Sequence, residues 1–321
     1  MKIPFLLIAT ALLVLWAPHE IYAAGITPGK ALAPFSPQIK PGEYVWAPEL
    51  SPSGPVIVIV NLQEQLLFVY RNGMRIGRSS ISSGKSGYAT PTGVFTILEK
   101  EVEHTSTIYD ASMPYMERLT WGGVALHAGN LPGYPAAHGC VRLPLEFAKK
   151  LYKVTSRGTT VIVADRVATT DGTTSPGLLF DKAYGANMRP GPISWHPESS
   201  QKGAVTIIVS SADKAAYVYR DGAEIGHSLV AKLPRIKGTY VYSALNQVDA
   251  TGRRNWLATT VKDKRPPDIK KLVDKSHIDP QFLANVRALV VPGTTLILTS
   301  EPVGVSTRSD RGFNILTAVV K

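Results

Sequence analysis

The residues whose types and spacing could do chemistry lie between His127 and Arg142. Cys140 is the only cysteine in the chain, and it stands in the run 138–142, His-Gly-Cys-Val-Arg. A histidine can accept the thiol proton and then stabilise the thiolate as an imidazolium. A buried structural thiol is the alternative, because free cysteine is among the most buried residue types. The polar neighbours favour a cysteine nucleophile with His127 as its base.

The flanking residues suit acyl transfer. Gly139 allows a tight bend, which would direct the amides near Cys140 at a developing oxyanion. Arg142 supplies a fixed positive charge that grips a carboxylate in a bidentate way. We expect an active site of this kind to lower the pKa of the Cys140 thiol below its free value of about 8.5, whereas a decayed site leaves the thiol inert.

The segment 126–144, LHAGNLPGYPAAHGCVRLP, resembles the signature of the L,D-transpeptidase catalytic domain (YkuD-type fold) of bacterial cell-wall enzymes. Upstream, the run 90–93, Thr-Pro-Thr-Gly, is similar to that family's Thr-Pro-x-Gly motif. The resemblance covers about a third of the chain, residues 54–165. It implies that Cys140 is the nucleophile, that His127 activates it, and that His138 and Gly139 help with orientation or the oxyanion.

Two departures from the family pattern concern the loop. Many members have His-Gly-Thr where this chain has the run 127–129, His-Ala-Gly, and the loop from His127 to Cys140 is a few residues shorter than in many relatives. A shorter loop would narrow the donor pocket or change which acceptor enters. Neither departure removes a catalytic group.

The same resemblance implies a substrate and a reaction. Cys140 would attack the carbonyl between the diaminopimelate and the terminal D-Ala of a peptidoglycan stem peptide. An amine of a second stem, a lysine of an envelope protein or water would then resolve the acyl-enzyme. Arg142, Tyr115 and Trp121 are the predicted substrate-binding residues, with Met116 beside them. The resemblance implies that the enzyme uses no metal and no cofactor. It also implies that carbapenems inactivate the enzyme.

Other classes of function fit the pattern less well. Papain-like peptidases place the cysteine before the histidine, and sortases separate the two much more widely. A zinc site built from His127, His138 and Cys140 lacks the close Cys and His pairs of zinc-binding repeats. The run 83–86, Ser-Gly-Lys-Ser, fails as a phosphate loop because its first glycine would fall at Ser79. A wall-binding scaffold with a decayed site and an L,D-carboxypeptidase stay open as alternatives.

The amino terminus predicts export. Residues 1–23 read as a signal peptide, with Lys2, an apolar stretch from Phe5 to Trp16 and small residues at the cleavage point. The apolar stretch is short for a membrane span, so an uncleaved anchor is the lesser alternative. The formal net charge is +11. Because the protein is predicted to be exported, anionic wall polymer or membrane surface is a better partner than nucleic acid. We therefore expect a periplasmic, wall-associated protein.

An internal repeat divides the chain. Residues 54–81 align without a gap on 203–230, and 147–163 resemble 282–298, but the second copy has no cysteine. Each copy predicts two strands, a hairpin into a third strand, and later a short helix and a closing strand. We expect a mainly β fold, a sandwich or partly closed barrel with short helices. The predicted segments are a Pro-rich linker (24–53), a catalytic domain (54–165), a second linker (166–202) and a smaller degenerate repeat (203–321).

Overall fold

The computed structural model describes residues 26–34, 36–106, 110–165, 170–174, 193–221, 223–250, 252–260, 272, 275–303 and 314–317. The predicted signal peptide therefore lies outside the described residues, as does much of the second predicted linker. The described chain is mainly β, with two large sheets and two α-helices, which confirms the predicted fold class. None of its helices is both long and apolar enough to cross a membrane.

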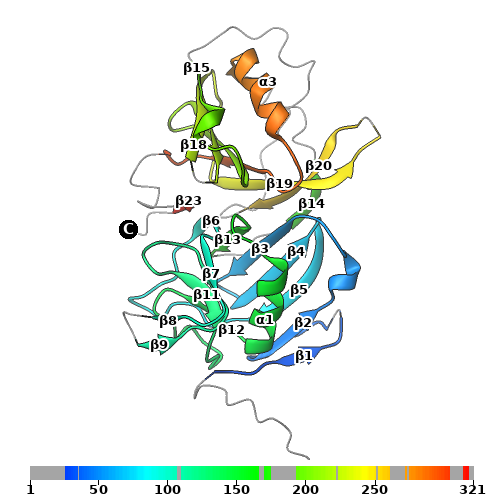
Figure 1. Ribbon diagram of the computed structural model, residues 1–321, viewed down its shortest axis with the longest axis vertical. Helices are drawn as coiled ribbons and strands as arrows, with labels where there is room; N and C mark the ends of the chain where they lie inside the picture. The colour runs from blue at the N-terminus through cyan, green and yellow to red at the C-terminus, as the bar shows by residue number, and fades with distance from the viewer. Residues whose placement is uncertain are drawn as a thin grey trace, which may run out of the picture.

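The first large sheet has the strand order β1-β2-β5-β4-β3-β13-β6-β23 (Figure 1). The predicted hairpin joins β4 to β5 through Asn72 and Gly73, both at positive φ, as a tight hairpin requires. Its strands are β1 (Lys30–Leu32), β2 (Glu43–Trp46), β3 (Val56–Asn61), β4 (Leu66–Arg71), β5 (Met74–Ser80), β6 (Gly93–Thr96), β13 (Thr160–Ala164) and β23 (Asn314–Thr317).

Residues 24–53, which were predicted to be a linker, instead contribute two strands to the first sheet. Strands β1 and β2 belong to the first sheet, and a 3₁₀ helix, Pro48–Leu50, follows them. Tyr44 and Trp46 pack their rings against Phe147, at centroid distances of 5.6 and 5.5 Å. The apolar area that these aromatic side chains bury anchors a segment whose prolines lie outside β2.

The second large sheet has the order β14-β20-β19-β22-β16-β17-β18-β15. Read from β15, its strands correspond one by one to those of the first sheet from β2 to β6. Trp195 of β15 packs on Phe282 as Trp46 packs on Phe147. The strands are β14 (Thr170–Thr174), β15 (Ile193–Trp195), β16 (Val205–Ser210), β17 (Ala215–Arg220), β18 (Ala223–Ala231), β19 (Thr239–Val248), β20 (Arg254–Thr260) and β22 (Thr295–Thr299), with β21 (His277–Ile278) beside β18 and a 3₁₀ helix at Pro197–Ser199.

A small four-stranded sheet, in the order β12-β11-β10-β7, carries the predicted chemistry. It is inserted between β6 and helix α1 (Leu145–Val154) of the first half. The second half has α3 (Pro280–Leu289) at the place that corresponds to α1. The strands are β7 (Glu99–Glu101), β10 (Met116–Arg118), β11 (Ala125–Ala128) and β12 (Val141–Leu143), with a separate hairpin of β8 (Thr105–Ser106) and β9 (Ala111–Ser112).

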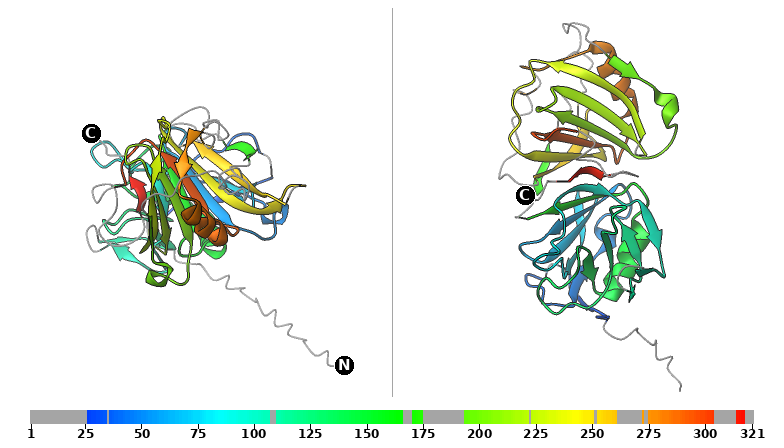
Figure 2. Two further views of the ribbon diagram at one scale, coloured as in Figure 1. Left: turned by 90° about the horizontal axis from the view of Figure 1, so that it is seen from above. Right: turned by 90° about the vertical axis from the view of Figure 1, so that its left-hand side faces the viewer.

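The two halves stack along the long axis of the molecule, with β23 between them (Figure 2). Strand β3 is apolar on both faces, as expected for a strand buried on both sides. Val58 and Val60 face α1 and the small sheet, whereas Ile57 and Ile59 face the second half. One hydrophobic cluster therefore crosses the boundary; its members are Ile57, Ile59, Val94, Ile162, Ala164, Ile208, Tyr219, Val241, Leu245, Leu257, Ile297 and Val303.

Contacts across this boundary are reciprocal. Thr160 and Thr295, which correspond in the two halves, share a hydrogen bond of 2.9 Å between their hydroxyls. Gly158 lies against Ala204, and its counterpart Gly293 lies against Pro55, the counterpart of Ala204. Such mutual contacts are those of a two-fold interface within one chain. They support the proposal that the second half is a degenerate repeat of the first.

Candidate active site

Strands β11 and β12 bring the predicted chemistry together. They are parallel and adjacent, with His127 opposite Arg142 and Leu126 opposite Val141. Cys140 directly precedes β12, so it stands beside Ala125. Because side chains alternate along a strand, His127, Cys140 and Arg142 project from the same face of the small sheet.

His127 is a buried, neutral base. Its side chain is 6% exposed, and Nδ1 lies 2.8 Å from the Ala128 carbonyl oxygen. A carbonyl oxygen only accepts, so Nδ1 carries the proton and Nε2 keeps its lone pair. Burial, and to a lesser extent the Arg142 charge, lowers the pKa of His127 to about 4, against the hydrogen bond to Ala128. The imidazole is therefore ready to accept a proton at neutral pH.

Cys140 rests as a thiol. Its Sγ donates to the Gly123 carbonyl oxygen at 3.4 Å, and it packs on the apolar cluster of Met113, Met116 and Ala125. Burial raises the pKa of the Cys140 thiol, although the Ala125 amide and the charge of Arg142 oppose the shift. The expectation of a lowered pKa is therefore wrong, because desolvation of the sulfur outweighs the nearby positive charge.

The Thr-Pro-x-Gly motif holds the backbone of the nucleophile. The Thr90 hydroxyl accepts a hydrogen bond from the Gly84 amide at 2.9 Å and lies 3.4 Å from the Cys140 carbonyl oxygen. A Cβ at Gly84 would come within 2.0 Å of the Tyr88 carbonyl oxygen, so no other residue fits there. Gly139 has φ +97°, a conformation that side chains disfavour. The local backbone around Cys140 therefore depends on these two glycines.

Arg142 is fixed by its backbone and by a glycine. Its amide and carbonyl pair with those of Ser82, at 3.0 and 3.1 Å. Its aliphatic chain lies on Gly129, where an added Cβ would come within 2.9 Å of Arg142 Cγ. The His-Ala-Gly run thus has a physical role, because its glycine provides the space that the arginine occupies.

His138 lies at the rim of the site. Its ring makes an edge contact with Tyr88 at 4.7 Å, and Lys85 Nζ lies 5.3 Å from the Tyr88 ring centroid. Partial burial, with the charges of Lys85 and Arg142, lowers the pKa of His138. A neutral His138 next to a half-exposed tyrosine suits orientation of a ligand.

Trp121 and Arg118 form the opposite rim. Trp121 is 46% exposed, and the Arg118 guanidinium lies 6.0 Å from its ring centroid. Arg118 pairs with Ala125 across the sheet, which places it on the face that carries Cys140, and its Nε binds Glu99 at 2.6 Å. Arg118 was not predicted from the sequence. Its spacing of two residues from Met116 was a usable signal, because side chains two apart on a strand lie on the same face.

Tyr115 lies apart from this face. Its ring packs on Tyr152 of α1, at 5.7 Å, and on the main hydrophobic core. No contact in the described part of the chain brings its ring to Cys140. A substrate-binding role for Tyr115 stays a prediction, whereas the next residue, Met116, lies in the cluster that contacts Cys140.

The amino-terminal segment supports the loop between His127 and Cys140. The Thr27 amide donates to the Gly129 carbonyl oxygen at 3.1 Å, and Thr27 Oγ1 accepts from the Leu131 amide at 3.0 Å. Pro41 lies against Gly133, within 2.9 Å of where a Cβ would be. Residues outside the predicted catalytic domain thus help to hold its active-site loop.

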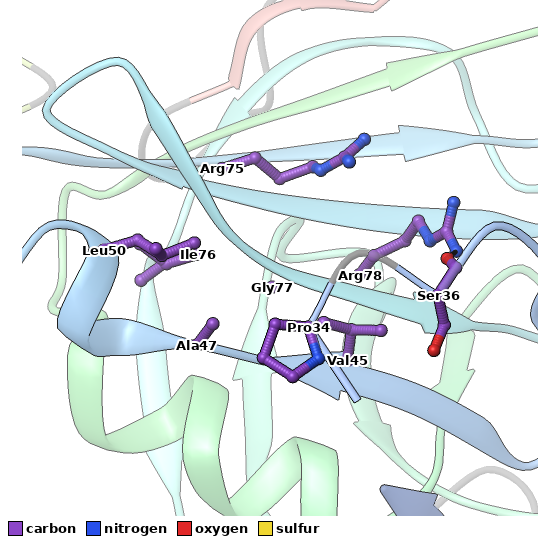
Figure 3. Close-up of a pocket in the computed structure, with 9 residues that line it drawn as sticks. All are labelled: Pro34, Ser36, Val45, Ala47, Leu50, Arg75, Ile76, Gly77 and Arg78. Carbon is purple, nitrogen blue, oxygen red and sulfur yellow. Dashed lines mark hydrogen bonds between the residues drawn. The ribbon is translucent and has the colours of Figure 1, made fainter. Parts of the chain in front are cut away.

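A hollow between β2 and β5 is a poor substrate site. Its volume is about 30 Å³, enough for one or two water molecules. Figure 3 shows Pro34 and Ser36 beside it, with Arg78 directed at Ser36, whose carbonyl oxygen accepts its hydrogen bond. Within the described residues, no three His, Cys, Asp or Glu side chains gather as metal ligands do.

Comparison with known families agrees with this geometry. Residues 55–163 match the family model described as the L,D-transpeptidase catalytic domain, YkuD. This segment belongs to that family. The match ends before the second half of the chain begins, so the family covers the sheet that carries Cys140 and His127 together with β3 to β6 and β13. Among curated proteins, no sequence matches the chain significantly.

Solved L,D-transpeptidases resemble part of the chain. The enzyme from Stackebrandtia nassauensis is 33% identical over 37% of this chain and 60% of its own, with a TM-score of 0.33. The enzyme from Mycobacterium smegmatis is 27% identical over 34% and 58%, with a TM-score of 0.32. L,D-transpeptidase 1 from Mycobacterium tuberculosis is 26% identical over 34% and 62%, with a TM-score of 0.31. The chain thus spans about three-fifths of the length of these structures.

Proposed function

We propose that this protein is an exported peptidoglycan L,D-transpeptidase. The observation that carries the proposal is the placement of Cys140, His127 and Arg142 on one face of two adjacent strands in a domain of that family. Cys140 is the nucleophile, His127 the general base and acid, and Arg142 a ligand for a substrate carboxylate. The substrate is a stem peptide that ends in diaminopimelate and D-Ala.

The first step transfers the Cys140 proton to Nε2 of His127 as the sulfur attacks. A thiolate and an imidazolium formed in advance are disfavoured, since burial raises the pKa of Cys140 and lowers that of His127. Proton transfer is therefore coupled to formation of the carbon–sulfur bond. The thiol hydrogen bond to Gly123 is lost in this step.

The acyl-enzyme then forms and is resolved. As the amide bond to D-Ala breaks, the His127 imidazolium protonates the departing amine, which leaves a thioester on Cys140. An acceptor amine attacks the thioester carbonyl, gives its proton to His127, and forms the new amide. The sulfur leaves with that proton as the Cys140 thiol. A diaminopimelate side chain as acceptor gives a 3→3 cross-link, and a lysine of an envelope protein attaches that protein.

The basic site matches an acidic substrate. Arg142 and Arg118 both act on Cys140 electrostatically, and stem peptides carry several carboxylates. Gly139 and His138 complete the wall beside the nucleophile, where the Gly139 bend orients the amides that stabilise the oxyanion. Trp121 supplies an exposed aromatic surface for the donor peptide.

Export and domain organisation belong to the same proposal. A signal peptide over 1–23 delivers the protein to the periplasm, where its net charge of +11 favours the anionic cell wall. Residues 54–165 are the catalytic domain, and 203–321 are a degenerate repeat without the catalytic motif.

A carbapenem tests the nucleophile. The mature protein is incubated with meropenem, and its intact mass is compared with that of Cys140→Ala. We expect one drug adduct on the wild type and none on the variant. Correctly folded wild-type protein that keeps a free thiol and takes no adduct would instead favour a wall-binding scaffold or a different thiol enzyme.

A further inference from the structure

A cavity of about 300 Å³ lies at the boundary between the two halves. That volume is at the lower end of the range for small-molecule sites, about 300–1,000 Å³. Both halves line it through the starts of β3 and β16 and through the turns that follow α1 and α3. The lining residues are Pro55, Val56, Ile57, Ser156, Arg157, Gly158, Thr159, Thr160, Gly203, Ala204, Val205, Ser243, Val291, Pro292, Gly293 and Thr294.

The lining is symmetric in position and asymmetric in chemistry. Thr159 corresponds to Thr294, but Ser156 and Arg157 correspond to Val291 and Pro292. Arg157 is thus the single charged side chain of this cavity. It is exposed, and it has no ion-pair partner among the residues that the structure describes. One unpaired guanidinium among hydroxyl groups is suited to a carboxylate.

A second hollow adjoins this cavity on the side of Trp121. It shares Arg157, Gly158 and Ala204 with the cavity, has a volume of about 70 Å³, and reaches Trp121. Gly123, whose carbonyl oxygen lies 3.4 Å from Cys140 Sγ, is two residues from Trp121. Trp121 thus belongs both to the rim of the candidate active site and to the wall of the hollow that contains Arg157.

We propose that the boundary between the two halves is a second substrate subsite, in which Arg157 binds a carboxylate of the stem peptide that reacts at Cys140. This proposal rests on the proposed function. It assigns the second half a role in binding, because Ala204 and Asp221 complete the wall beside Trp121. Asp221 lines the same hollow as Arg157 and carries a negative charge, so it weakens the binding of an anion by Arg157.

Substitutions that remove the positive charge of Arg157 or the negative charge of Asp221 test the subsite. We compare wild type with Arg157→Gln, Arg157→Lys, Asp221→Asn and the control Lys153→Gln, which removes an exposed positive charge at the end of α1 outside both hollows. Asn is compatible with the positive φ of 46° at Asp221. The readouts are kcat and KM for tetrapeptide stem, separately for D-Ala release and for cross-linking, and the rate of meropenem acylation.

We expect Arg157→Gln to raise KM by at least about tenfold with little change in kcat, as loss of a charged hydrogen bond predicts. Arg157→Lys should restore part of that loss, Asp221→Asn should lower KM, and Lys153→Gln should change nothing. An effect on D-Ala release assigns the carboxylate to the donor stem, and one confined to cross-linking assigns it to the acceptor.

Two results separate this proposal from the proposed function. Meropenem has no stem peptide to place at Arg157, so its acylation rate should be the same in all variants. If acylation proceeds normally and KM for the stem is the same with Arg157→Gln as with Lys153→Gln, the subsite is wrong and the function stands. If the protein does not turn over the stem, binding replaces kinetics as the readout. The Kd of the tetrapeptide is measured by calorimetry for Cys140→Ala and for the double variant Cys140→Ala, Arg157→Gln. Equal Kd values also overturn the subsite.

Discussion

The proposed catalytic pair consists of two neutral groups, because burial raises the pKa of Cys140 and lowers that of His127. Cys140 keeps its proton because the sulfur is desolvated, and His127 stays unprotonated for the same reason. The hydrogen bond from Nδ1 to Ala128 fixes which ring nitrogen is basic. The sequence predicted both residues from their types, their spacing and the family resemblance. It could not give the direction of the thiol pKa, which depends on the apolar cluster of Met113, Met116 and Ala125 beneath the sulfur.

Acylation should therefore remain active in mild acid. With the pKa of His127 at about 4, the imidazole is still neutral at pH 5.5 and loses its lone pair only as the pH falls through about 4. We expect the second-order rate of meropenem acylation to be nearly flat from pH 5 to 7. An acid limb near pH 6.5, the ordinary value for histidine, would contradict this assignment. Folding at each pH is verified by circular dichroism.

Substitution of Gly129 should displace Arg142. In Gly129→Ala, the new Cβ would lie 2.9 Å from Arg142 Cγ, so the arginine side chain must move. We expect KM for the tetrapeptide stem to rise about tenfold, the size of a lost charged hydrogen bond, with a small change in melting temperature. Gly122→Ala is the matched control, since a Cβ there would meet only Thr120 Oγ1, at 3.7 Å, and leaves Arg142 in place. An unchanged KM in Gly129→Ala would show that Arg142 does not bind the substrate.

At the scale of elements, the active-site sheet is fastened to α1 by a buried polar cluster. Glu117 of β10 accepts a hydrogen bond from the Thr155 hydroxyl and lies 3.6 Å from Lys100 Nζ. Lys100 in turn donates to the carbonyl oxygens of Tyr152 and Thr155 at the end of α1, at 2.6 and 2.8 Å. Burial raises the pKa of Glu117 to about 7, against the effects of Thr155 and Lys100. These contacts join the small sheet to the carboxyl-terminal end of α1.

This cluster makes stability depend on pH. The folded state holds the Glu117 proton between pH 4.5 and about 7, where the unfolded chain has lost it. Its contribution is therefore complete below pH 4.5 and is lost as the pH rises through 7. We expect the melting temperature of wild type to fall relative to that of Glu117→Gln between pH 5 and 8. Parallel melting curves for the two proteins over this range would contradict the raised pKa.

The positions of the strands and helices were easier to predict from the sequence than the elements on which they pack. The repeated pattern predicted β3, β4 and β5 with their hairpin, and β16, β17 and β18 in the second half, because alternation and Asn-Gly or Asp-Gly turns are local signals. Proline content misdirected the reading of residues 30–50. Their place in the sheet comes from the packing of Tyr44 and Trp46 on the distant Phe147, which no local pattern reveals.

At the scale of the whole molecule, the two halves share a core. Apolar side chains of β3, β6 and β13 pack directly on those of β16, β19 and β22, and β23 near the carboxyl terminus adds to the first sheet through β6. The pairing of β23 with β6 could not be predicted from the repeat, because it joins a late segment to an early sheet. A protein that ended near Asp165 would expose Ile57, Ile59 and Ile162, so its loss of activity would not isolate a role in binding.

The shared core predicts one cooperative unfolding transition. Ile162 is fully buried at the boundary, and Ile162→Ala should destabilise the protein by about 2–4 kcal/mol, the usual cost of such a cavity. We expect calorimetry to show a single transition that moves as a whole to lower temperature. Val248→Ala, a change at an exposed apolar residue of the second half, is the control and should have little effect. Two transitions, with only one displaced by Ile162→Ala, would show that the halves unfold independently.

The most direct test of the proposed function is detection of the acyl-enzyme formed from the substrate itself. Wild type and Cys140→Ala are mixed with tetrapeptide stem, quenched within seconds, and analysed by intact and peptide-level mass spectrometry, with free D-Ala and cross-linked product measured in parallel. We expect an adduct on Cys140 with the mass of the stem minus D-Ala, followed by a 3→3 dimer. Absence of both in folded wild type that forms the meropenem adduct, or the same products from Cys140→Ala, would contradict it.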